Sequence, residues 1–207
     1  NNPISRFLIE IFANPPKESE FVASLAEISA AQKGGERIEP QIRALYQTNC
    51  SQCGAAIESQ AFVWDSATNA LVGKVYSCNY CKDSGERPAS PGDIARAARG
   101  AASALHRARA LERVAPLADP DRGYAEEALA MYPPRAVYIL FNLINRLESI
   151  SADHRRCVEA LLLAVFDQAN GLWGQTPTRT RPRQLNLPPR YLEKNIWLSL
   201  EEASKSW

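Results

Sequence analysis

The sequence has few of the residues from which most catalytic centres are built. It contains two histidines among 207 residues, His106 and His154, and each lies in a charged segment. A Ser-His-Asp or Cys-His arrangement therefore has no support, and we expect both histidines at the surface. The ten glycines are scattered, and none forms the strand, Gly-rich turn and helix that a nucleotide needs. We therefore assign no catalytic residue.

The chain also lacks a charge excess and a long apolar run. Its 24 Lys and Arg against 23 Asp and Glu give a net charge of +1, so contact with a polyanion would need a local cluster of cations. It has no run of about 18 apolar residues and no signal-peptide pattern, so we expect a cytoplasmic protein without membrane contact. The first residue is Asn1 and the only methionine is Met131. We therefore expect a piece of a longer protein.

Apolar residues at helical spacing predict helices over most of the chain. Asn2-Pro3 opens the first helix, since an Asn cap followed by proline suits a helix start, and Pro15-Pro16 ends it. Further helices are expected at about 18–31, 40–46, 93–115, 124–132, 135–150, 153–173 and 191–203, with Asp93 as an N-cap and a polar loop at 84–93. Segments 135–150 and 153–173 are the most apolar and should form the centre of the core.

Four of the five cysteines have the spacing of a metal site. Cys50, Cys53, Cys78 and Cys81 form two C-x2-C pairs separated by 24 residues. The intervening segment AFVWDSATNALVGKVYSC reads as a hairpin with a turn at DSATN, which would bring the pairs together around a tetrahedral zinc. Four thiolates leave no open position for water, so the zinc would be structural; four buried or redox-active cysteines are the alternative. Cys157 lies alone in an apolar segment and is expected in the core.

A second cluster is basic. Segment 176–194 carries five cations and one acid, Glu193, a net +4 in nineteen residues. The cations are Arg179, Arg181, Arg183, Arg190 and Lys194. Its prolines favour an extended shape, and Trp173, Tyr191 and Trp197 could stack on bases, so the arm could follow a phosphate backbone. The alternative is a surface strap whose arginines meet acids or helix C-termini.

Several stretches together resemble one protein family. They are NNPISRFLIEIFANPPK, AFVW, KVYSCNYC, LHRARALERVAP, INRLE, FDQANGLW and RPRQLNLPPRYLEKNIWLSLEEA. They resemble the middle part of large bacterial S-adenosylmethionine-dependent DNA methyltransferases, in which a zinc-ribbon and helical insertion interrupts a Rossmann-like catalytic domain. The resemblance implies that Asn1-Asn2-Pro3 follows the acidic residue that holds the methyl donor. It also implies that S-adenosylmethionine binds only to the full-length parent, and that the partners are DNA and the remainder of that chain.

The stretch Asn14-Pro15-Pro16-Lys17 is close to the catalytic Asn-Pro-Pro-aromatic tetrapeptide of amino-group DNA methyltransferases. That tetrapeptide follows a strand, whereas these prolines follow an expected helix. Lys17 also replaces the aromatic that would stack on a flipped base. We therefore expect the prolines to end a helix, and the catalytic parts to lie outside these 207 residues.

The sequence as a whole predicts an α+β fold, mainly α with a small β zinc ribbon. We expect N-terminal helices at 1–46, the ribbon at 47–83, and a helical domain at 84–207 with the basic arm at 175–190. The expected function is a noncatalytic zinc-binding insertion that positions DNA or a partner domain. The alternatives are a stand-alone zinc-dependent protein-interaction module and a complete small enzyme.

Overall fold

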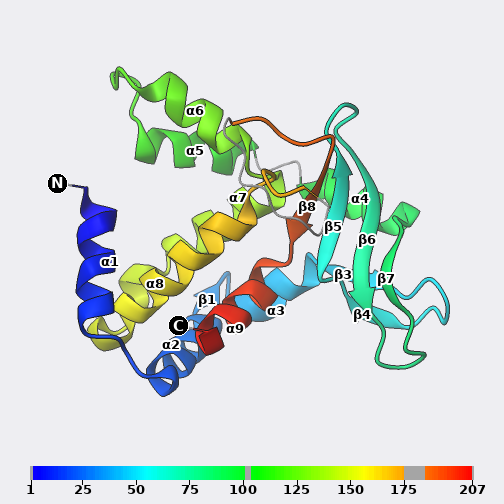
Figure 1. Ribbon diagram of the computed structural model, residues 1–207, viewed down its shortest axis with the longest axis horizontal. Helices are drawn as coiled ribbons and strands as arrows, with labels where there is room; N and C mark the ends of the chain where they lie inside the picture. The colour runs from blue at the N-terminus through cyan, green and yellow to red at the C-terminus, as the bar shows by residue number, and fades with distance from the viewer. Residues whose placement is uncertain (1, 101–103, 175–184, 207) are drawn as a thin grey trace.

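The computed structural model describes residues 2–100, 104–174 and 185–206, and it is a mixed α/β chain. Figure 1 shows most helices on one side and a four-stranded sheet on the other. The helices are α1 (Pro3–Ala13), α2 (Glu18–Ala30), α3 (Ile38–Ala44), α4 (Pro91–Gly100), α5 (Ala104–Val114), α6 (Arg122–Ala130), α7 (Pro134–Ile144), α8 (Ala152–Ala169) and α9 (Ile196–Ser206). The strands are β1 (Gln32–Lys33), β2 (Glu36–Arg37), β3 (Gln47–Asn49), β4 (Ala56–Glu58), β5 (Ala61–Asp65), β6 (Ala70–Ser77), β7 (Ser84–Pro88) and β8 (Arg190–Lys194).

Helix α1 begins and ends where the sequence predicts. The Asn2 side chain accepts a hydrogen bond from the Ile4 N–H at 2.9 Å, and Pro3 is the first helical residue. The helix stops at Ala13, before Pro15-Pro16, so the expectation that these prolines follow a helix is confirmed. Its Ile11 is buried, whereas Ile9 points into solvent.

Helix α8 lies at the centre of the core and packs against α2 and α9. Its Leu161 and Val165 are buried together with Ile139 and Leu143 of α7 and Trp197 of α9. Each fully buried aliphatic side chain contributes about 1.5–3 kcal/mol. The prediction that the two most apolar segments form the core is confirmed. None of the helices in the described ranges is long and apolar enough to cross a membrane.

The main sheet has the strand order β7-β6-β5-β8, and every neighbouring pair is antiparallel. The predicted hairpin is present as β5 and β6. At its turn, the Asp65 carboxylate accepts a hydrogen bond from the Thr68 N–H at 2.8 Å, and Asn69 has a φ of 50°. The turn predicted at DSATN is therefore confirmed.

Two strands of the main sheet lie where the sequence predicts none. Segment 84–93, expected as a loop, contains β7, which pairs with the free edge of β6. The last helix, expected from residue 191, begins only at Ile196, because Arg190–Lys194 pairs with β5 as β8. Asn195 ends the strand and caps the helix, since its Oδ1 accepts the Trp197 N–H at 3.0 Å. Strands on both sides of the expected boundary between the ribbon (47–83) and the helical domain (84–207) thus share one sheet.

The N-cap of α4 also differs from the prediction. Ser90 caps the helix, Pro91 is its first residue, and Asp93 reaches back to the cap. The Asp93 carboxylate accepts hydrogen bonds from the Ser90 N–H at 2.9 Å and hydroxyl at 2.6 Å, and the Ser90 Oγ accepts the Asp93 N–H at 3.2 Å. This is a capping box in which the acid occupies the third helical position. The prediction of Asp93 as the N-cap is wrong by three residues.

Candidate metal centre

The four spaced cysteines form one cluster. Cys50 and Cys53 lie between β3 and β4, and Cys78 and Cys81 lie between β6 and β7. All four Sγ atoms lie within 4.8 Å of one another, with 3.5 Å between those of Cys50 and Cys81 and 3.7 Å between those of Cys53 and Cys78. A tetrahedral metal with bonds of about 2.3 Å would place its sulfurs about 3.8 Å apart. The cluster therefore has the size that a four-thiolate metal site requires.

The first pair is held by a tight turn. The Cys50 N–H donates to the Ala55 carbonyl at 2.8 Å, and the Gly54 N–H donates to the Cys50 carbonyl at 3.0 Å. Gly54 has a φ of 74°, a conformation that costs a residue with a side chain about 1–2 kcal/mol. A glycine directly after the first pair avoids this cost.

The second pair repeats this geometry. The Cys78 N–H donates to the Asp83 carbonyl at 2.8 Å, and the Lys82 N–H donates to the Cys78 carbonyl at 3.0 Å. Lys82 takes the place of Gly54, with a φ of 65°. Lysine rarely adopts this conformation, yet Lys82 repeats that of Gly54. This indicates that the turn is fixed by the need to direct both thiols of the pair toward one point.

The electrostatics of the cluster favour a bound cation. The backbone N–H groups of Cys53 and Gln52 hydrogen-bond to the Cys50 thiol and lower its pKa to about 6. A backbone hydrogen bond from Asp83 lowers the pKa of Cys81, but burial and the neighbouring thiols outweigh it and raise this pKa to about 12. The charge of the first thiolate therefore disfavours deprotonation of the neighbouring thiols, so four thiolates need a positive ion among them.

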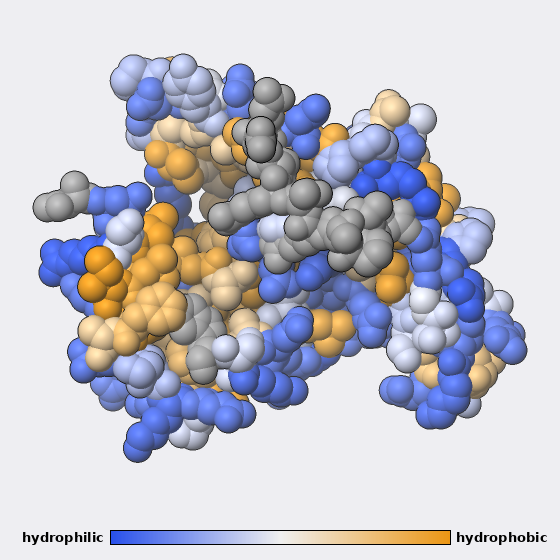
Figure 2. Space-filling view, viewed as in Figure 1, coloured by the Kyte–Doolittle hydropathy of each residue, from blue (hydrophilic) through white to orange (hydrophobic). Residues whose placement is uncertain are grey.

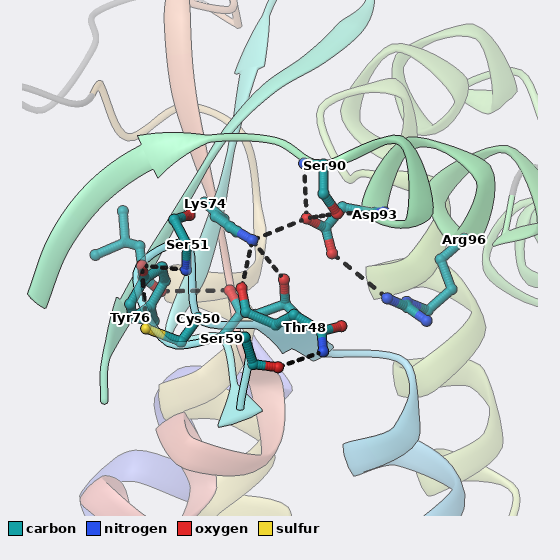
Figure 3. A network of polar contacts seen from close by, with 12 residues as sticks. Thr48, Cys50, Ser51, Ser59, Lys74, Tyr76, Ser90, Asp93 and Arg96 are labelled. Atoms are coloured by element: carbon teal, nitrogen blue, oxygen red, sulfur yellow. Dashed lines mark hydrogen bonds and ion pairs between the residues drawn. The ribbon is translucent and has the colours of Figure 1, made fainter. Parts of the chain in front are cut away.

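Tyr76 connects the two turns from inside the sheet. Its hydroxyl accepts the Ser51 N–H at 2.8 Å, donates to Asp83 Oδ2 at 2.6 Å and lies 3.8 Å from the Cys50 Sγ (Figure 3). This hydrogen bond from Tyr76 is the main cause of the lowered pKa of Asp83, and Arg87 binds the same carboxylate. The ring is fully buried. One phenol thus orients a backbone donor of the first turn and an acid of the second.

A buried ion pair ties the first turn to helix α4 (Figure 3). Lys74 of β6 is 2% exposed, and its Nζ donates to the Asn49 carbonyl at 2.6 Å and to Thr48 Oγ1 at 3.0 Å. The same Nζ lies 3.4 Å from Asp93 Oδ2, and Asp93 is 0% exposed. Asn49 directly precedes Cys50, so α4 is linked through one ammonium group to the strand that enters the cysteine turn.

The sequence predictions missed Tyr76, Asp83 and Lys74. A signal for the first two exists, because Tyr76 stands two residues before Cys78 and Asp83 two residues after Cys81. Metal-ligating groups commonly have polar neighbours that orient them by hydrogen bonds. Lys74 stands alone among the apolar residues of its strand, and its partner is nineteen residues further along the chain.

The basic arm is described only at its end. Arg179, Arg181 and Arg183 lie outside the described residues. Arg190 donates to Glu86 Oε1 at 2.6 Å, and Lys194 donates to Gln168 Oε1 at 2.9 Å. The side chains of these two residues, predicted to bind nucleic acid, thus form hydrogen bonds to other residues of the chain.

The aromatic side chains that could have stacked on bases beside the arm are not all accessible. Tyr191 and Trp197 are buried, so the prediction that they stack on bases is wrong. Trp173 is half-buried and donates its indole N–H to the Asp167 carbonyl at 2.5 Å.

The remaining predicted residues are structural. Cys157 is buried in α8, as predicted, and burial raises its pKa. His106 is half-buried between the ring edges of Tyr138 and Phe141, so the prediction of a surface histidine is only partly right for it. His154 binds Glu27 Oε2 through Nδ1 at 2.5 Å. Within the described ranges, no hydrogen bond joins either histidine to a hydroxyl or thiol group.

No family model matches this chain, and no curated protein or solved structure matches it. The resemblance to methyltransferase insertions thus stays a prediction. The cluster of four cysteines could hold one metal ion. A closed shell of four thiolates suits a soft tetrahedral ion such as zinc, and it leaves no position for substrate or water.

Proposed function

We propose that this chain is a noncatalytic zinc-binding module of a DNA methyltransferase-like protein, and that it positions DNA or a partner domain. The observation that supports it most is the cluster of four Sγ atoms within 4.8 Å, held on two turns of matching geometry. Zinc is the proposed metal because tetrahedral four-cysteine sites on such turns commonly hold it. The β3–β4 and β6–β7 hairpins would then form a zinc ribbon.

The need for a metal follows from how little apolar material surrounds the cluster. Around the cysteines, the buried group consists of Cys50, Cys78 and Tyr76, with Ile57 and Cys81 packed against it. So small a core stabilises little by itself. Structural zinc binding contributes about 10–16 kcal/mol in zinc-finger peptides, which is enough to fix both hairpins.

The partner-domain part of the proposal is supported by an apolar face on the helical side. Figure 2 shows this face over α1 and α8. Helix α1 exposes Ile4, Ile9 and Phe12. A groove of about 370 Å³ runs between α1 and α8, and Ile4, Phe7 and Phe166 line it. Apolar patches of this kind mark contact sites for other proteins or domains.

The metal part is tested by cysteine variants. Cys50→Ser should lose zinc and disorder the two hairpins, while amide resonances of α8 and α9 stay in place. Cys157→Ala is the matched control, because it removes a thiol of the core and should keep zinc bound. Zinc bound equally by both variants would refute the assignment of the ligands.

The DNA part is tested by salt-dependent binding of a duplex. Affinity that falls steeply with salt, and drops when Arg179, Arg181 and Arg183 are changed to Ala, supports it. The control changes the exposed Lys17 and Arg37 to Ala, which should have little effect. Absence of binding at low salt would favour the alternative, a stand-alone zinc-dependent protein-interaction module. Heat on titration of S-adenosylmethionine into this segment would instead favour a complete small enzyme.

A further inference from the structure

Three basic side chains gather where the β1–β2 hairpin meets helices α5 and α7. The Lys33 ammonium of β1 donates to the Tyr138 hydroxyl of α7 at 2.5 Å and lies 4.2 Å from the centre of its ring. The His106 ring of α5 packs edge-on against Tyr138, with 4.9 Å between the ring centres. Arg109 follows His106 by three residues, so the two side chains share one face of α5. These four residues are called the Lys33 cluster below.

The positive charge of the Lys33 cluster is not balanced by acids. In the described part of the chain, neither Lys33 nor Arg109 forms an ion pair. Glu36 stands opposite Lys33 in the hairpin, but no ion pair joins the two. Burial, followed by the charges of Lys33 and Arg109, lowers the pKa of His106, so both cations act on this ring. The cluster is thus a patch that an anion would stabilise.

The Lys33 cluster also has hydrogen-bond donors to offer to a ligand. The Tyr138 hydroxyl accepts from Lys33, which leaves its own proton for another acceptor, and the ammonium has two further N–H groups. Lys33 and Tyr138 are half-buried, whereas Arg109 is exposed and carries a guanidinium with five N–H donors. The donors come from three separate elements, so a ligand that joins them needs several acceptor oxygens.

We infer that the Lys33 cluster binds a phosphate group, held by Lys33, Arg109 and the Tyr138 hydroxyl. A phosphomonoester carries a charge of about −1.5 to −2 and three strong acceptor oxygens, one for each donor group. A carboxylate has a single charge and two oxygens. His106 senses the charge of the ligand and does not bind it, because its Nδ1 is buried. The cysteines and the basic arm take no part, so this inference does not rest on the proposed function.

The test follows the two histidine resonances of the zinc-loaded chain by proton NMR during a pH titration. Inorganic phosphate should raise the pKa of His106, because a nearby negative charge stabilises the imidazolium. The titration curve of His154, the other histidine, should not move and is the internal control. Sodium chloride at equal ionic strength measures the screening of Lys33 and Arg109 by salt. An equal rise with chloride, or no rise at millimolar phosphate, would overturn the inference.

Two variants should change phosphate binding in opposite directions. Lys33→Met removes one cation and should weaken binding about tenfold, the effect of losing one charge-assisted hydrogen bond. Glu36→Gln removes the acid opposite Lys33 and should strengthen binding, a result that partial unfolding could not produce. The exposed Lys17→Met is the control and should bind like the parent chain. Equal binding by Lys33→Met and Lys17→Met, or weaker binding by Glu36→Gln, would contradict the assignment.

Two further probes identify the source of the phosphate group. Dimethyl phosphate is a diester with one charge, like the backbone of a nucleic acid, whereas inorganic phosphate stands for a small monoester. Tighter binding of inorganic phosphate, which we expect because two cations face the site, supports a small phosphate ligand. Comparable binding of the diester supports the same site with a nucleic-acid backbone as its source. Acetate that binds as tightly as inorganic phosphate would overturn the choice of ligand.

Discussion

Replacing Lys74 by Met should destabilise the chain strongly, although it keeps the length of the side chain. The change removes the ammonium group from Asp93, which is 0% exposed, and from the Asn49 carbonyl. Breaking a buried ion pair in this way costs about 3–5 kcal/mol. Asp93 keeps its hydrogen bonds from Ser90, so we expect about 3 kcal/mol, near the lower limit. For a chain of this size that lowers the melting temperature by about 6–12 °C.

The assay is thermal or urea unfolding of the zinc-loaded protein, with the exposed Lys17→Met as the control. After Lys74→Met the Asp93 carboxylate keeps only the 3.4 Å ion pair with Arg96. A second variant, Lys74→Met with Asp93→Asn, removes this incompletely paired charge and should recover part of the loss. A cost for Lys74→Met below about 0.5 kcal/mol, the range of ordinary surface changes, would refute the reasoning. The reasoning would also be refuted if the double variant had a lower free energy of unfolding than Lys74→Met, as expected when the two changes act independently.

Three other changes test the support of the cluster and of the helices. Tyr76→Phe leaves the cysteines in place but removes the hydroxyl between the two turns, so zinc affinity measured against a chelator should fall about 10–100-fold; an unchanged affinity would contradict this role. Gly54→Ala should cost about 1 kcal/mol and Lys82→Gly should gain up to about 1 kcal/mol, because both positions have positive φ; thermal unfolding would contradict this if both changes had the same sign. A backbone hydrogen bond from Ser151, together with a side-chain hydrogen bond from His154, lowers the pKa of Glu27. The ionised Glu27 therefore stabilises the fold above its unfolded pKa, and this stabilisation is lost as pH falls through the folded pKa. Glu27→Gln should therefore flatten the acid side of the stability curve, and an unchanged curve would rule this out.

The cluster could be predicted from the sequence because its geometry is mostly local. Two C-x2-C pairs each fold on their own turn, and the left-handed position after the first pair is a glycine. The hairpin between the pairs has strong strand-forming residues and a recognisable turn. The helix start at Asn2-Pro3 was predictable for the same reason, since a cap acts over a few residues.

The rest depends on contacts between distant segments. The composition of Ser84–Pro88 does not favour a strand; it becomes β7 because the edge of β6 lies beside it. Arg190–Lys194 could continue a helix, but it pairs with β5, which lies more than 120 residues earlier. Lys74 and Asp93 were not expected in the interior, because charged residues are buried only when a partner is supplied by the fold.

The central claim is that four thiolates hold one zinc, and X-ray absorption at the zinc edge tests it most directly. Freshly purified, reduced protein should contain one zinc per chain. Four sulfur atoms should lie about 2.3 Å from the zinc, and these are the Sγ atoms of Cys50, Cys53, Cys78 and Cys81. A sample without zinc, or a zinc with nitrogen or oxygen among its nearest neighbours, would contradict it.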